Sequence, residues 1–284
     1  MANTIDFKKK HRVFKTPGVF YSVSGRNLEP EMTLVDYLKI YYMYTDLAQI
    51  ESVFGHLATP CPLYGGRSFK PDRSFTERHV RQMEEHGIPL ALTMTGHFFD
   101  EDAYQKSRAV LDAGYKKGHS VICTNDELAR RLRKDYPDYT LKASIIKQLD
   151  TLEKIERALD LYDVAVVPMN LNDDDAFLEA IPDKGRVILF GNADCAYTCP
   201  ARTCYRGFSQ ANTGQPVTGS CSKPRLARLD LGHVFFDVEK FSFMGFRHFK
   251  LVPLAPPRAQ AVVRHFSSNH DRGAEPRLLV RSWP

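Results

Sequence analysis

The sequence of 284 residues lacks the features that define several protein classes. No apolar run reaches the length of about 18 residues that a membrane-spanning helix needs, so no membrane span is expected. The N-terminus has no apolar stretch with a cleavage site, which argues against a secretory signal and makes a reducing cytoplasm the expected compartment. Neither G-x-G-x-x-G nor a Walker sequence occurs, which disfavours a dinucleotide or P-loop site. Ordinary contents of apolar (43%) and charged (26%) residues exclude a disordered, collagen-like or coiled-coil chain.

Positive charge is concentrated at the two ends of the chain. The net charge of +5 divides into +4 for residues 1–15, +3 for residues 258–284 and −2 for the residues between them. Basic arms can contact phosphate or an anionic partner, although solvated tails explain the same charges. The chain divides into three predicted parts: a basic N-terminal arm (1–26), a folded body that holds a cysteine cluster (27–255) and a polar, Arg-rich C-terminal tail (256–284).

Segments with strand character alternate with helical segments through most of the body. The expected strands are 89–95, 120–124, 140–144, 164–168, 186–190 and 249–252. The expected helices are 74–86, 101–117, 127–134, 149–161 and 173–180. Strands that alternate with helices predict a parallel sheet of the α/β class. The short connections and the number of strands favour a TIM-like (β/α) barrel over an open sheet.

Two segments that precede these strands are interpreted separately. Apolar residues at roughly helical spacing predict a long helix over residues 29–57. Residues 63–67 predict a short strand that ends at two glycines.

In a (β/α) barrel, catalytic residues lie where the strands end. The candidates at such positions are His97, Asn125, Ser144 and Lys250. His97 can serve as an acid or a base because imidazole titrates near neutral pH, although a histidine at a strand end is more often structural. Lys250 can bind an anionic group or pair with a carboxylate. Ser144 lacks the G-x-S-x-G context of a nucleophilic serine.

Four of the six cysteines fall within 27 residues, where an even distribution would place fewer than one. They are Cys195, Cys199, Cys204 and Cys221, with the spacing C-x3-C-x4-C-x16-C. The cluster follows the expected strand 186–190, so its sulfurs are expected at the catalytic end of the barrel. Four neighbouring thiolates repel one another, and they therefore need a cation.

The spacing of the cysteines leaves the identity of this cation open. Structural zinc usually takes pairs of closely spaced cysteines, whereas an iron–sulfur cluster tolerates looser spacing. The C-x3-C-x2-C spacing of radical S-adenosylmethionine enzymes is absent, and disulfides are disfavoured in a reducing compartment. An iron–sulfur cluster is the preferred interpretation, and zinc is the alternative.

Four stretches of the sequence resemble the motifs of one known family. They are LYGGRSF at 63–69, the strand, helix and strand passage over 121–144, the N-x-G of 212–214 within the cysteine region, and GFRHFK at 245–250. In order and spacing they resemble the peptidase U32-like barrel proteins. This family includes collagenase-like peptidases, oxygen-independent hydroxylases of anaerobic ubiquinone biosynthesis, and bacterial tRNA and rRNA hydroxylation proteins.

The resemblance implies a (β/α) barrel, complete or with strands missing, and a [4Fe–4S] cluster held by the four clustered cysteines. The chain also departs from the family pattern. Residues 251–254 read LVPL where the family continues with an I-E-G-R-like stretch, and residues 168–171 lack the family's acidic residue. The missing carboxylate argues against transferring a peptidase or hydroxylase mechanism directly.

Two functions of different classes follow. The first is an iron–sulfur oxidoreductase that hydroxylates or otherwise modifies a small molecule or RNA without oxygen, with the substrate near the four candidate residues. The second is a zinc-stabilised barrel that serves as a binding or scaffold protein for nucleic acid or a protein partner. Peptidase activity is disfavoured because no nucleophile, base and orienting group can be named. The resemblance also suggests a homo- or hetero-oligomer with a related subunit.

Overall fold

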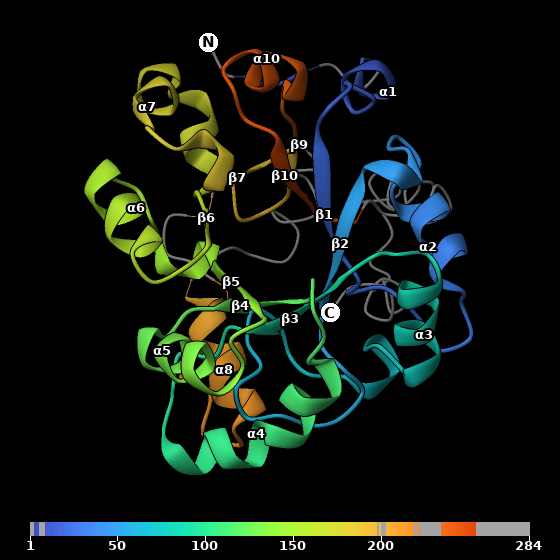
Figure 1. The fold of residues 1–284 in the computed structure, drawn as a ribbon, viewed down its shortest axis with the longest axis vertical. Helices are drawn as coiled ribbons and strands as arrows, with labels where there is room; N and C mark the ends of the chain where they lie inside the picture. Colours follow the sequence, from blue (N-terminus) through green and yellow to red (C-terminus); the bar gives the residue numbers. More distant parts are fainter. Residues whose placement is uncertain are drawn as a thin grey trace, which may run out of the picture.

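The computed structural model describes residues 3–5, 9–197, 199, 203–218, 221 and 234–253. Within this part of the chain, eight parallel strands form a closed barrel in the order β1-β10-β7-β6-β5-β4-β3-β2 (Figure 1). Successive strands along the chain are neighbours in the barrel, and β10 closes it between β7 and β1. The predicted α/β barrel is confirmed, and it is complete.

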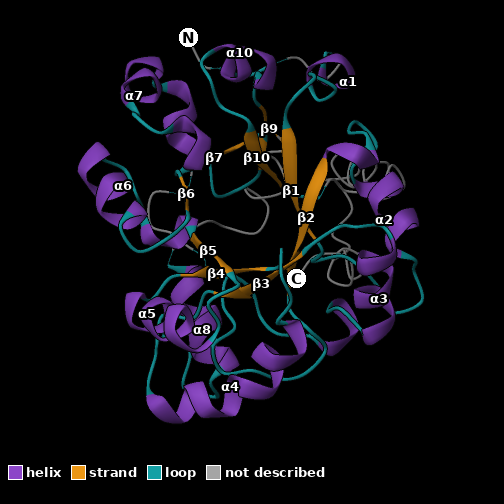
Figure 2. Ribbon diagram, in the orientation of Figure 1, coloured by secondary structure: helices purple, strands orange, loops and turns teal. Residues whose placement is uncertain are grey.

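The barrel strands are β1 (Phe20–Ser24), β2 (Ile50–Gly55), β3 (Leu90–Met94), β4 (Ser120–Cys123), β5 (Thr140–Ala143), β6 (Val164–Val166), β7 (Val187–Phe190) and β10 (His248–Leu251). A separate antiparallel pair joins β8 (Asn192–Ala193) to β9 (Val234–Phe235). The α-helices are α1 (Lys10–Val13), α2 (Leu34–Tyr41), α3 (Glu77–Glu85), α4 (Glu101–Gly114), α5 (Asp126–Asp135), α6 (Leu152–Leu159), α7 (Asp175–Ala180), α8 (Cys204–Asn212) and α10 (Val238–Phe243). Helices surround the ring of strands (Figure 2).

Most strand residues are apolar, which fits strands that are covered on both faces. All residues of β4 and β7 are buried, as expected for parallel strands between outer helices and a filled barrel interior. Helix α5 buries Leu128, Ala129 and Leu132 on one face, which is the pattern of a helix packed against such a sheet. None of the helices in the described part of the chain combines the length and apolar character that crossing a bilayer requires.

The strands predicted from residue 89 onward are confirmed as β3–β7 and β10, and the predicted helices are confirmed as α3–α7. The long helix predicted over 29–57 is wrong. Helix α2 ends at Tyr41, and β2 occupies residues 50–55. The segment IESVFG is rich in β-branched and aromatic residues, and it pairs with β1 and β3 to continue the barrel.

The segments around β2 need two further corrections. Residues 63–67 form a loop rather than a strand, because the chain here packs against the end of β3, where Gly96 N donates to Leu63 O over 2.9 Å. The first barrel strand, β1, lies within the segment 1–26 that the charge distribution assigns to an arm. The barrel therefore begins before residue 27. The predicted tail over 256–284 lies outside the described residues.

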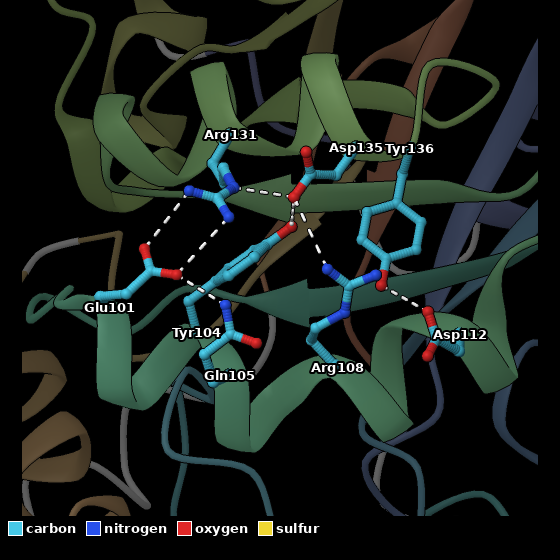
Figure 3. A network of polar contacts seen from close by, with 8 residues as sticks. All are labelled: Glu101, Tyr104, Gln105, Arg108, Asp112, Arg131, Asp135 and Tyr136. Atoms are coloured by element: carbon cyan, nitrogen blue, oxygen red, sulfur yellow. Dashed lines mark hydrogen bonds and ion pairs between the residues drawn. The ribbon is translucent and has the colours of Figure 1, made fainter.

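A network of polar side chains joins α4 to α5 (Figure 3). The carboxylate of Asp135 accepts hydrogen bonds from the Tyr104 hydroxyl at 2.8 Å and from Nε of Arg131 at 2.7 Å. Arg108 lies 3.8 Å from the same oxygen. The guanidinium of Arg131 also lies over the Tyr104 ring, 4.8 Å from its centroid. One carboxylate thus organises groups from both helices.

The variant Asp135→Asn is expected to lower the thermal unfolding midpoint at pH 7 by a few degrees. An amide provides one acceptor oxygen and no charge in place of the carboxylate. The hydrogen bonds from Arg131 and Tyr104 hold the pKa of Asp135 below its ordinary value. This stabilisation is present above the carboxyl pKa of the unfolded chain and is lost as the pH falls through the lower folded-state pKa.

The measurement is thermal unfolding of the wild-type protein and Asp135→Asn at pH 7 and pH 3. The control is Asp102→Asn, which removes an exposed ion pair with Lys106 and is expected to change the midpoint little. Equal losses in the two variants at pH 7 would contradict the structural role of Asp135.

Candidate functional site

The carboxyl ends of the parallel strands meet at one end of the barrel, which we call the carboxyl rim. The segments that follow β1, β2, β3 and β7 bring polar side chains to this rim. These residues are Arg26, His56, His97, Asp194 and Cys195.

The four clustered cysteines are half-buried, form no disulfide, and lie on the segment that follows β7. Cys204 is the first residue of α8. Burial, together with the charges of Asp194, Cys204 and Cys221, raises the pKa of Cys195 to about 12. Burial also raises the pKa of Cys204, with added effects from Cys221 and Cys199. The thiols therefore lie close enough to influence one another's ionisation.

The chemistry of these residues fits a metal centre. The raised pKa values of Cys195 and Cys204 mean that these two thiols hold their protons at pH 7, and a bound cation would reverse this by stabilising the thiolates. Four cysteines suit either a [4Fe–4S] cluster or zinc. Among the described residues, which include all four cysteines, no three His, Cys, Asp or Glu side chains are already arranged around one ion. The donors therefore fit a metal centre in kind, and their arrangement around an ion would have to form on binding.

Arg26 provides a positive charge beside the cysteines. Its guanidinium forms an ion pair with Asp194, with NH2 and Oδ2 3.1 Å apart, and both side chains are mostly buried. The charge of Arg26 also lowers the pKa of Cys195, opposing the effects of burial and Asp194. The pair links the segment after β1 to the start of the cysteine segment.

Helix α8 is anchored to the loops that follow β2 and β3. The side-chain amide of Asn212 donates to the carbonyl oxygens of Tyr64 (3.1 Å) and Arg67 (2.9 Å), and its oxygen accepts from Phe69 N at 2.7 Å. Because α8 begins at Cys204, these contacts fix the position of one thiol relative to the rim.

His97 contacts α8 directly. Its Nδ1 lies 2.8 Å from Oγ of Ser209, and the same oxygen accepts the backbone N–H of His97 at 3.2 Å. Burial lowers the pKa of His97, and the charge of Arg206 lowers it further, so the imidazole is neutral at pH 7. Its Nε2 has no hydrogen-bond partner among the described residues, which leaves one ring nitrogen available for proton transfer.

Asn125 and Ser144, two of the predicted catalytic residues, have local structural roles. The Asn125 side chain caps α5 by accepting from the backbone N–H groups of Glu127 and Leu128. Ser144 is buried and accepts from Ile146 N at the start of a 3₁₀ turn. These contacts account for a polar residue at the end of each strand.

Lys250 lies in the barrel interior rather than at its edge. It is 7% exposed, and its ammonium lies 4.0 Å from the centroid of the Phe54 ring. Among the described residues, no carboxylate forms the ion pair with Lys250 that the sequence suggested as one possibility. Burial and the charge of Lys142 lower the pKa of Lys250 to about 7. Near neutral pH this amine can therefore exchange a proton.

Arg26 and His56 do not appear among the residues predicted from sequence. His56 is fully buried, and its ring stacks on Tyr64 with centroids 4.1 Å apart. Burial lowers its pKa strongly, aided by the charge of Arg67, and its Nδ1 is buried without a hydrogen-bond partner. Both residues follow strands that the sequence interpretation missed. The β-branched and aromatic content of IESVFG would have indicated His56.

Comparison with solved structures finds this architecture in the U32 peptidase Mk0906. The two structures align with a TM-score of 0.54 and 18% sequence identity, over 84% of this chain and 94% of that chain. The chain has a U32-type fold. No family model matches the sequence, and no curated protein sequence is significantly similar to it. At this level of identity, the similarity establishes the U32-type fold and leaves the activity to be argued from the site.

Proposed function

We propose that the protein is an iron–sulfur oxidoreductase whose substrate binds at the carboxyl rim. The observation that supports this function is the group of four half-buried cysteines at the carboxyl rim of a U32-type barrel, where the neighbouring cysteines raise the pKa values of Cys195 and Cys204. The proposed reaction is the oxygen-independent hydroxylation of a small molecule or RNA.

Cys195, Cys199, Cys204 and Cys221 would hold a [4Fe–4S] cluster. Hydroxylation by water releases two electrons and two protons, and a bound cluster supplies one-electron transfer towards an external acceptor. Arg26 places a fixed positive charge next to Cys195 and so favours its thiolate form. The Asp194 carboxylate holds this guanidinium in position.

His97 and Lys250 are the groups whose lowered pKa values suit proton transfer; His97 lies at the carboxyl rim and Lys250 lies in the barrel interior. His97 is held through Nδ1 by Ser209, so Nε2 is the atom that can accept a proton from substrate or water. The amine of Lys250, with its pKa of about 7, can bind an anionic group when protonated or accept a proton when neutral.

The Ser209 and His97 pair does not suggest a serine peptidase. Ser209 is fully buried within α8, and its hydroxyl lies within hydrogen-bonding distance of Tyr205 O at 3.1 Å. A nucleophile must be accessible and must be activated by a base that a third group orients. We therefore assign Ser209 the role of positioning His97.

The test is iron, sulfide and zinc analysis of protein purified without oxygen, together with the absorbance near 400 nm. We expect about four irons and four sulfides per chain. Cys199→Ala is expected to lose most of the iron, the sulfide and the absorbance. The matched control is Cys61→Ala. Cys61 is a buried thiol that contacts Ser107 Oγ at 3.1 Å, so its loss should leave the iron content unchanged.

Stoichiometric zinc without iron or sulfide would overturn the redox proposal and select a zinc-stabilised scaffold. In that case, salt-sensitive binding of the protein to RNA would identify nucleic acid as the partner.

A further inference from the structure

The end of the barrel at which the strands begin holds a cavity of about 200 Å³, which we call the amino-end cavity. Six of its lining residues carry polar side chains: Glu51, Ser52, Ser120, Thr140, Lys142 and His248. Ser120, Thr140 and His248 are the first residues of their strands. The cavity is therefore distinct from the carboxyl rim.

Two polar groups of the cavity lack protein partners. Ser120 is 2% exposed, and its hydroxyl is buried without a hydrogen bond. Lys142 is 8% exposed, and its ammonium makes no hydrogen bond or ion pair within 4 Å among the described residues. Leaving a buried hydroxyl or ammonium without a partner is costly. Native proteins usually satisfy such groups with a ligand or water.

The two groups belong to one surface. Ser120 on β4 is the register partner of Thr140 on β5. Lys142 lies two residues beyond Thr140, so both β5 side chains point to the same face. All three residues line the cavity. The arrangement presents an ammonium and two hydroxyls to one small volume.

The charge of the lining favours an anion. The one carboxylate among the lining residues, Glu51, is already engaged by His248, with Oε2 and Nδ1 2.6 Å apart. Lys142 makes no ion pair within 4 Å among the described residues, and the Glu51 charge acts on it only from a longer distance. The charge of Lys142 also lowers the pKa of Lys250, so a second amine lies within electrostatic range of Lys142. A cation would therefore be repelled by the Lys142 ammonium and by Lys250 whenever it is protonated, whereas an anion would compensate these charges.

We propose that the amino-end cavity binds a small oxyanion, a phosphate, a sulfate or a short carboxylate, through the Lys142 ammonium and the Ser120 hydroxyl. The volume lies below the range of about 300–1,000 Å³ typical of sites for drug-sized ligands, which excludes a nucleotide. Both Lys142 and Ser120 donate hydrogen bonds to the ligand, and charge-assisted bonds of this kind are the stronger ones. The site is independent of the cluster at the carboxyl rim.

The test is isothermal titration calorimetry of the full chain at low ionic strength with phosphate, sulfate and acetate as separate probes. The expected result is a dissociation constant below about 1 mM for at least one probe. The preferred probe shows whether the site selects a tetrahedral or a planar anion. Lys142→Met is expected to weaken binding at least tenfold, and Ser120→Ala about threefold to tenfold.

Two controls distinguish this site from other anion sites. Lys39→Met, which removes an exposed lysine, and Cys199→Ala at the carboxyl rim should both retain wild-type affinity. Absence of binding to the wild-type protein, or unchanged affinity in Lys142→Met, would overturn the proposal. If Lys142→Met does not fold, the affinity of Ser120→Ala tests the proposal instead. Wild-type affinity in Ser120→Ala would also overturn the proposal.

Discussion

Gly65→Ala is expected to lower the free energy of unfolding by about 3 kcal/mol or more. A Cβ atom at this position would lie 2.2 Å from the carbonyl oxygen of Thr95 and 2.6 Å from the nitrogen of Gly96. Both contacts are with backbone atoms at the end of β3, so no side-chain rotation relieves them. The loop that carries Gly65 also receives the hydrogen bonds of Asn212, and the substitution should therefore disturb α8 as well.

Chemical denaturation with urea measures this loss, and Gly87→Ala is the matched control. Gly87 has a φ of +63° and no atom within 4 Å of an added Cβ. Its substitution should cost only the strain of the left-handed conformation, about 1–2 kcal/mol. A loss in Gly65→Ala no larger than that in Gly87→Ala would show that the loop does not approach β3 this closely.

Lys250→Met is expected to stabilise the protein by a few kcal/mol at pH 6, and this gain should disappear towards pH 10. Burial lowers the pKa of Lys250 from 10.5 to about 7, so the folded state binds a proton less readily than the unfolded chain does. Below pH 7 the full cost of burying the charge is present. Between pH 7 and about 10.5 the folded state holds Lys250 neutral while the unfolded chain holds it protonated. The free-energy cost of releasing this proton on folding falls as the pH rises and vanishes near pH 10.5. Methionine keeps the contact with the Phe54 ring.

Urea denaturation of wild-type protein and Lys250→Met at several pH values tests this expectation, with the exposed Lys39→Met as the control. The control should show a small difference at every pH. A stability gain in Lys250→Met that stays constant from pH 6 to pH 10 would mean that Lys250 is not held in a desolvated site.

The sequence predicted the barrel well from β3 to β7, because each strand there is a short apolar run and each helix has an amphipathic pattern with recognisable ends. Asn125 before α5 and Gly118 after α4 are such signals. The prediction failed before β3. The tyrosines and leucines of α2 share helical spacing with the apolar residues of β2, so periodicity alone merged a helix and a strand into one segment.

The candidate site was foreseen in part. The clustering of four cysteines after β7 is visible in the sequence, and the structure brings these thiols within electrostatic range of one another. The roles of the other residues depend on contacts that spacing does not reveal. Ser209 holds His97 across more than one hundred residues of sequence. The amino-end cavity arises from the register of several strands, which brings Ser120 and Lys142 to one face without a hydrogen-bond partner for either side chain among the described residues.

The position of the cysteines between β7 and β10 bears on how the chain folds. The barrel closes when β10 inserts between β7 and β1, and residues 191–247 must first lead from the carboxyl rim back to the end of the barrel at which the strands begin. The entropy cost of such a closure grows with loop length. A cation bound by both Cys195 and Cys221 would close the first half of this connection into a loop of its own. The length of chain that remains to be closed would then be shorter. Cofactor insertion would then accelerate barrel closure, and protein made without the metal would fold more slowly.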